Sequence, residues 1–242
     1  MSGFSPAFER LGAALAAVVL QQQETLAEFL PREDWSADLT ARTYTSGGVT
    51  VRVGLLGSYA TRERTWLWGW ANPQFGEDHP AVRPTLPIRA IGERLGIPEF
   101  TTPEVDLSWY EGPAGHGGEL VAMAAGGVLG GGGYIGAGYD GGSAYLHVDD
   151  PQAPPAGWDP VPVPRLLTNA TSLFAREPRL TLARLLSRHR VPYRERGEVT
   201  EVLLPGGGTA RAFFDNRGRF VRWESDLAAA PVPDDHGVPL VH

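Results

Sequence analysis

The sequence contains neither cysteine nor lysine, so arginine supplies all 21 basic residues of the 242-residue chain. Without cysteine, the chain cannot form disulfides, thiolate zinc sites or a thiol nucleophile. Without lysine, it cannot form a Schiff base, attach pyridoxal phosphate or supply the lysine of a P-loop. The remaining composition, with 42% hydrophobic and 20% charged residues, is that of a globular protein.

A long hydrophobic run is also missing. The apolar stretch from Leu11 to Leu20 is far shorter than the ~20 residues that a membrane span requires. No net positive charge precedes it and no small-residue cleavage site follows it, which argues against a signal peptide. Apolar residues recur instead at helical spacing, so we predict one amphipathic helix over residues 5–30, ended by Pro31. We expect a cytoplasmic protein with no membrane partner.

The net charge of −7 argues against nucleic-acid binding by the whole chain, but the charge is uneven. Residues 165–222 hold 12 arginines against 5 acidic residues, and the rest of the chain holds 9 against 23. A stripe within the basic segment predicts binding of an acidic partner, because guanidinium groups suit carboxylates and phosphates. Alternatively, the stripe is a solvated face paired with Glu195, Glu198 and Glu201. Its members are Arg184, Arg188, Arg190, Arg194 and Arg196, with His189.

The order of elements predicts an α+β fold with antiparallel β-meanders, each covered by helices, in two docked subdomains. The N-terminal domain, residues 1–150, should contain strands over 35–44, 49–57, 63–71, 102–109 and 143–148 and a helix over 117–129. A Pro-rich linker over 151–164 follows. The C-terminal unit, 165–228, should contain a helix beginning at Pro178 and strands over 198–204, 209–214 and 219–224, and 229–242 form a loose tail.

Three tryptophans alternate in the segment Thr65-Trp66-Leu67-Trp68-Gly69-Trp70-Ala71-Asn72. On a strand, Trp66, Trp68 and Trp70 share one face. They form either an aromatic platform for a flat ligand or partner, or the core of the sheet beneath the N-terminal helix. The first interpretation makes them binding residues of a small-ligand sensor.

Two glycine-containing motifs do not carry the chemistry that they resemble. Gly131 to Gly136 matches GxGxxG, but a helix precedes it and a strand follows, the reverse of a dinucleotide site. Gly141 to Tyr145 begins like a nucleophile elbow, but Tyr145 occupies the place of the final glycine. We therefore expect no dinucleotide and no other cofactor.

One group of side chains offers ligands for a metal ion. His116 and Glu119 are three residues apart on a predicted helix, and His147 and Asp149 share a predicted strand face. If that helix packs beside that strand, the four could support metal-assisted hydrolysis. Otherwise Asp149 belongs to a solvated strand end and no metal is bound.

Two further motifs carry a resemblance. Leu56-Gly57-Ser58-Tyr59 followed by the tryptophan segment, together with Phe214-Asp215-Asn216-Arg217-Gly218-Arg219, resembles a family of uncharacterised bacterial proteins with an LGSY…TWLWGWAN motif and a C-terminal FDxxGR hairpin. The resemblance implies a mostly antiparallel α+β fold and a bacterial source, and it carries over no site residues. We expect a non-catalytic binding module with an acidic body and an arginine-rich C-terminal face; the alternative is the metal-assisted hydrolase.

Overall fold

A long helix begins the fold. The computed structural model describes residues 3–31, 33–113 and 115–226, so the expected tail over 229–242 lies outside the described residues. Helix α1 spans Pro6–Phe29, as predicted. The Ser5 hydroxyl accepts a hydrogen bond from the Phe8 N–H at 3.2 Å, which caps the helix, and Pro6 suits its first turn. Pro31 follows shortly after its last residue, where the chain leaves the helix.

An antiparallel seven-stranded sheet forms the body, which confirms the α+β prediction. The strands β1 (Trp35–Asp38), β2 (Thr43–Ser46), β3 (Val49–Ala60), β4 (Thr65–Trp68) and β5 (Glu104–Asp106) pair in chain order. The 12 residues of β3 also pair with β7 (Gly142–Val148), which in turn pairs with β6 (Tyr134–Tyr139). Between these strands lie the helices η1 (Gly69–Ala71), η2 (Arg83–Thr85), α2 (Pro87–Leu95), α3 (Pro98–Thr101) and α4 (His116–Leu129).

The three alternating tryptophans lie in the core. Trp66 and Trp68 are 0% exposed and Trp70 is 9% exposed, as the core interpretation requires. The Trp68 indole N–H donates to the backbone oxygen of Glu99 at 2.9 Å. The strand does not continue to residue 71 as expected, because the chain turns into η1 at Gly69. A Cβ at Gly69 would lie 2.8 Å from the backbone oxygen of Leu55, so only glycine allows this close approach to β3.

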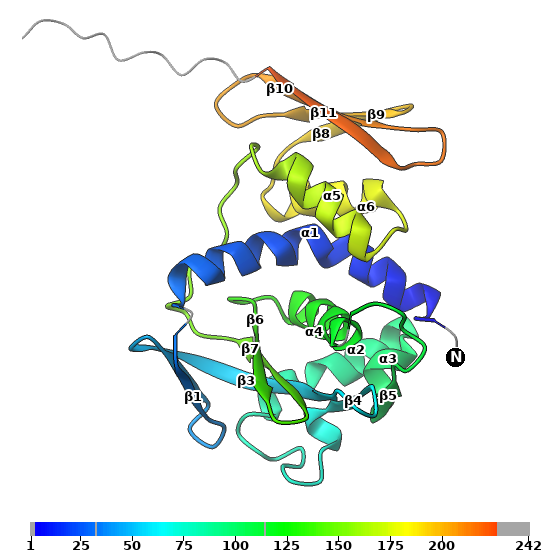
Figure 1. Cartoon of the computed structure of the whole chain (residues 1–242). Helices are drawn as coiled ribbons and strands as arrows, with labels where there is room; N and C mark the ends of the chain where they lie inside the picture. The colour runs from blue at the N-terminus through cyan, green and yellow to red at the C-terminus, as the bar shows by residue number, and fades with distance from the viewer. Residues whose placement is uncertain (1–2, 32, 114, 227–242) are drawn as a thin grey trace, which may run out of the picture.

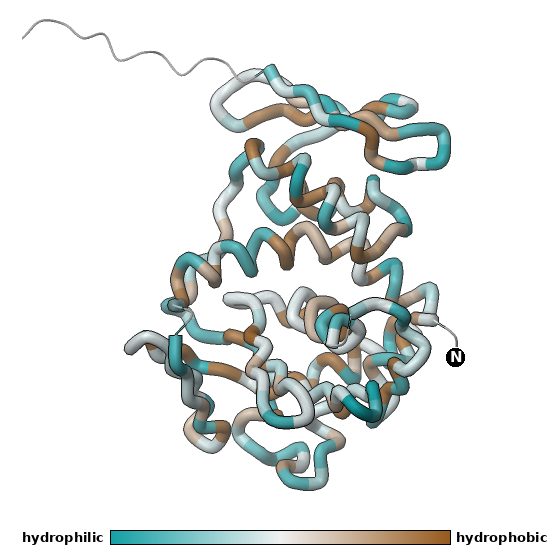
Figure 2. The backbone as a smooth tube through the Cα atoms, in the orientation of Figure 1, coloured by the Kyte–Doolittle hydropathy of each residue, from teal (hydrophilic) through white to brown (hydrophobic). Residues whose placement is uncertain are grey.

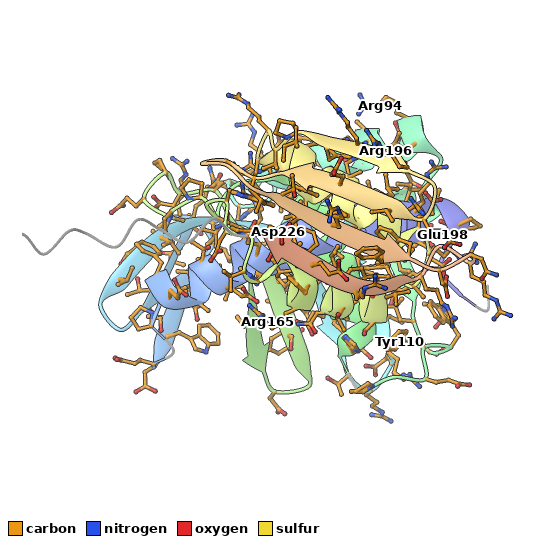
Figure 3. All side chains as sticks on the ribbon, turned by 90° about the horizontal axis from the view of Figure 1, so that it is seen from above. Arg94, Tyr110, Arg165, Arg196, Glu198 and Asp226 are labelled. Carbon is orange, nitrogen blue, oxygen red and sulfur yellow. The ribbon has the colours of Figure 1, made fainter. Side chains whose placement is uncertain are left out.

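The C-terminal unit consists of two helices and a four-stranded antiparallel sheet. Helix α5 (Val163–Leu173) was not predicted and begins inside the expected linker, and α6 (Pro178–Arg188) follows. The sheet has the order β11 (Phe220–Asp226), β10 (Thr209–Phe214), β9 (Val199–Leu203), β8 (Tyr193–Arg196). Figure 3 shows it from above, with Arg196 on the β8 side and Asp226 on β11. Its other face covers α5 and α6.

Helix α1 is the middle layer of the molecule. Figure 1 shows α5, α6 and the small sheet above it, and α4 with the large sheet below it. Small residues allow these contacts: a Cβ at Gly12 would overlap the Phe174 ring at 2.3 Å, and Ala13 is fully buried. The Thr181 hydroxyl of α6 donates to the backbone oxygen of Ala13 at 2.7 Å. Figure 2 shows hydrophobic segments along α1, where the helix lies between the two layers. None of the helices in the described ranges is long and apolar enough to span a membrane.

Two neighbouring glycines of α4 provide a matched test of this packing. A Cβ at Gly127 would lie 2.7 Å from Cγ2 of Val19 on α1, whereas a Cβ at Gly126 would lie at an ordinary 3.5 Å from the Tyr134 ring. Alanine is favoured over glycine in a helix by about 1 kcal/mol, and overpacking costs ~1–3 kcal/mol. We expect Gly126→Ala to raise the free energy of unfolding and Gly127→Ala to lower it, measured by urea denaturation. Equal changes in both variants would contradict the close contact between α1 and α4.

Candidate ligand-binding groove

A groove of about 530 Å³ lies where the body, α1 and the C-terminal unit meet. One turn of α1 forms its floor through Leu15, Val18 and Val19. The end of α4 and the glycine turn that follows it form one wall, with Gly126, Gly127, Gly130, Gly131 and Gly133. The end of α6 forms the other wall, with Arg184, Ser187, Arg188 and His189. The remaining lining residues are Gln21, Gln22 and Ala156.

The groove has a positive wall, and no acidic residue is among its described lining residues. Arg184 and Arg188 are four residues apart on α6, so one helix face carries both. Both are exposed, and within the described ranges neither forms an ion pair. Arg190, the third arginine predicted to bind, lies just beyond the helix, is exposed and does not line the groove. The groove therefore presents two guanidinium groups that have no counter-ion in residues 3–31, 33–113 and 115–226.

Three consecutive glutamines of α1 hold the surroundings of the groove in place. The Gln21 amide donates to the Gly157 oxygen at 2.9 Å. Gln22, which is 8% exposed, accepts from the Ala156 N–H at 2.9 Å and donates to the Pro154 oxygen at 3.0 Å. Gln23 accepts from the backbone N–H of Tyr134 at 2.8 Å and donates to its oxygen at 2.9 Å. These bonds fix the Pro-rich segment and the start of β6 on α1.

His189 lines the groove and is linked by hydrogen bonds through Gln21 to the Gly157 oxygen. Its Nε2 lies 2.7 Å from Oε1 of Gln21, whose amide nitrogen is already committed to the Gly157 oxygen. The Gln21 oxygen thus faces the ring, which assigns the ring proton to Nε2. Burial lowers the pKa of His189, and the charge of Arg188 lowers it further. The ring also packs against the indole of Trp158, with centroids 5.6 Å apart.

His147 supports the glycine turn from below. It is 4% exposed, and its Nε2 lies 2.7 Å from the Gly130 oxygen, so this nitrogen carries the proton. Its Nδ1 has no hydrogen-bond partner among the described residues. Burial lowers the pKa of His147, and the bond to Gly130 and the charge of Asp149 offset this only in part. His147 is thus a neutral, structural histidine next to the groove.

The predicted convergence of His116, Glu119, His147 and Asp149 is wrong. The Nδ1 of His116 lies 3.0 Å from the Tyr110 hydroxyl, and His147 contacts Gly130 instead. Asp149 forms ion pairs with Arg42 and with Arg52, the latter at 3.0 Å. In residues 3–31, 33–113 and 115–226, no group of three or more histidine, aspartate or glutamate side chains could hold a metal ion. The helix packs near the sheet, but its polar residues point to different partners.

Sequence reasoning missed the role of Gln21, Gln22 and Gln23. A signal was present, because a Pro-rich segment without secondary structure must satisfy its buried backbone groups elsewhere. Side-chain amides on a buried helix face both donate and accept, so they suit that task. The sequence did not show which loop they would contact, since their partners lie more than 100 residues away.

Comparison with protein families supplies one match. A family model described as a family of unknown function, DUF6882, matches residues 9–151. The match contains the tryptophan segment and ends before the hairpin at 214–219. Comparison with curated proteins and with solved structures found no match.

The lowered pKa values of the buried His147 and the half-buried His189 predict a pH-dependent stability. Below pH ~6.5 the unfolded chain binds protons that His147 and His189 take up only at lower pH in the folded protein. The free energy of unfolding should therefore fall as the pH is lowered from 7.5 to 5.5, and His147→Gln should reduce that fall. Urea denaturation at both pH values measures it.

His79→Asn is the matched control. The His79 ring accepts from the Ala81 N–H at 3.2 Å, a bond that an asparagine oxygen can replace. This variant should keep the wild-type fall in stability. An unchanged fall in His147→Gln would contradict the structural role of that histidine.

Proposed function

We propose that this chain, which belongs to a family of unknown function, DUF6882, is a non-catalytic binding protein whose groove binds an acidic segment of a protein partner. The observation that carries the proposal is a pair of arginines, Arg184 and Arg188, on the groove wall: among the described residues neither has an ion-pair partner and no acidic residue lines the groove. On a chain with a net charge of −7, such a local concentration of positive charge favours an acidic ligand.

The alternative of a self-paired helix face has less support. It requires the arginines to pair with Glu195, Glu198 and Glu201, and no such pair forms in the part of the chain that the structure describes. Glu201 lies instead 3.8 Å from Arg211 on the neighbouring strand. A carboxylate of a partner can accept two parallel N–H bonds from one guanidinium group, and such bonds are about twice as strong as neutral ones.

The positive surface continues beyond the groove. Arg190 follows α6, and Arg194 and Arg196 lie on β8; all three are exposed. Figure 3 shows Arg196 at the outer side of the small sheet. Several exposed arginines within residues 184–196 suit an extended acidic segment better than a single small anion. We propose that the interaction takes place in the bacterial cytoplasm.

The test reverses the charge of the groove. A fluorescein-labelled peptide of eight glutamates serves as the acidic probe, and fluorescence anisotropy measures its affinity. We expect Arg184→Glu/Arg188→Glu to weaken binding at least tenfold and to reduce its dependence on salt, because two partner contacts become repulsive.

The control variant is Arg62→Glu/Arg217→Glu, which changes the net charge equally in two exposed turns outside the groove. Arg188 lies in the last turn of α6, where a positive charge stabilises the helix by about 0.3–1 kcal/mol. The neutral variant Arg184→Gln/Arg188→Gln therefore checks that a loss of binding is not a loss of folding. Equal weakening in the control, or no weakening in the groove variants, would contradict the proposal.

A further inference from the structure

A second cavity, of about 710 Å³, lies on another part of α1, and we propose that it binds a small organic cation with an apolar body. It is bounded by the C-terminal half of α1, the start of α4, β1 with β2, and β6. The volume falls in the range of about 300–1,000 Å³ that small-molecule sites occupy. The arginine groove is lined by a different set of α1 residues, so the two sites are separate.

Apolar side chains form about half of the cavity wall. Those from α1 are Leu20, Leu26 and Leu30, and those from α4 are Leu120 and Met123. This wall can bury an alkyl or aryl group, which is worth about 25 cal/mol for each Å² removed from water.

Two carboxylates give the cavity its charge. Glu33 and Glu119 both line it, and neither forms an ion pair within the described ranges. No arginine is among the described lining residues, and the chain contains no lysine. His116 also lines the cavity, and its Nδ1 lies 3.0 Å from the Tyr110 hydroxyl. The dipole of α4 stabilises the negative charge of Glu119, which lies in the first turn of that helix. Glu33 lies on no helix, so no helix dipole stabilises its charge. The pair therefore favours a cationic ligand.

Aromatic rings provide the remaining contacts for a cation. Trp35 is 45% exposed at the rim of the cavity and stacks on Tyr44, with ring centroids 5.7 Å apart. An ammonium group over such a ring gains about 0.5–2 kcal/mol. Deeper in the cavity, the Tyr134 hydroxyl lies 3.5 Å from Oε1 of Glu119. Burial, chiefly, and the charge of Glu119 raise the pKa of Tyr134, so its hydroxyl stays protonated beside the carboxylate.

The test uses a fluorescent amine and its neutral counterpart. Monodansylcadaverine combines an apolar dye with a primary ammonium group, and its N-acetylated form keeps the dye and lacks the charge. We expect the amine to bind with increased dansyl fluorescence and the acetylated form to bind at least tenfold more weakly. Glu33→Gln/Glu119→Gln should lose that preference, and Trp35→Ala should weaken binding of the amine several-fold.

Matched variants separate this site from general charge effects. Glu63→Gln/Glu195→Gln removes the same charge from two exposed positions outside the cavity and should leave the affinity within twofold. Arg184→Glu/Arg188→Glu should also leave the affinity for the amine within twofold, so the outcome does not depend on the arginine groove. Circular dichroism checks that each variant is folded, and Trp35→Ala decides the result if the double glutamate variant is not. No binding of the amine, equal affinity for both probes, or unchanged affinity in the cavity variants would overturn the proposal.

Discussion

The close packing of α1 against two layers is the constraint on which the rest of the structure depends. A helix buried on two sides needs small residues where its neighbours approach, and Ala13, Ala16 and Ala17 are fully buried there. Glycines serve the same purpose, since neither Gly12 of α1 nor Gly127 of α4 leaves room for a Cβ. The alanine-rich helix thus belongs to the core of the body and to that of the C-terminal unit.

Both candidate sites follow from this central position. The arginine groove forms where the end of α6 meets α1 and the end of α4, so its positive wall comes from the C-terminal unit and its glycine wall from the body. The acidic cavity forms where the C-terminal half of α1 meets the start of α4, β1 with β2, and β6. One helix therefore separates two concave surfaces of opposite charge, and the three glutamines of α1 fix the loops between them.

Local patterns predicted the elements better than their contacts. The helical spacing from Phe8 onward gave α1 its bounds, and the antiparallel α+β class followed from the order of strands and turns. Period-two alternation placed Trp66 and Trp68 on one face but did not reveal that Gly69 would end the strand against β3. Helix α5 was hidden by the prolines around it, although Pro164 occupies the first turn, where proline is tolerated.

The candidate sites were harder to predict for the same reason. Arg184 and Arg188 were found because charge pattern is visible in the sequence, whereas the groove beside them needs α1 and α4, more than 50 residues away. The metal hypothesis was wrong because helix spacing and strand alternation each describe one element and not how two elements face each other. The prediction of two docked subdomains stays a prediction. Because α1 packs against both units, the test is whether the two units unfold together.

Native-state hydrogen exchange tests the shared core most directly. If α1 belongs to both units, the slowest amides of α1, β3 and α6 exchange through one global opening and report one free energy of unfolding. Thr181→Val, which removes the hydroxyl bonded to the Ala13 oxygen, should then lower that free energy in all three elements together. Faster exchange in α6 while α1 and β3 remain fully protected would contradict the account.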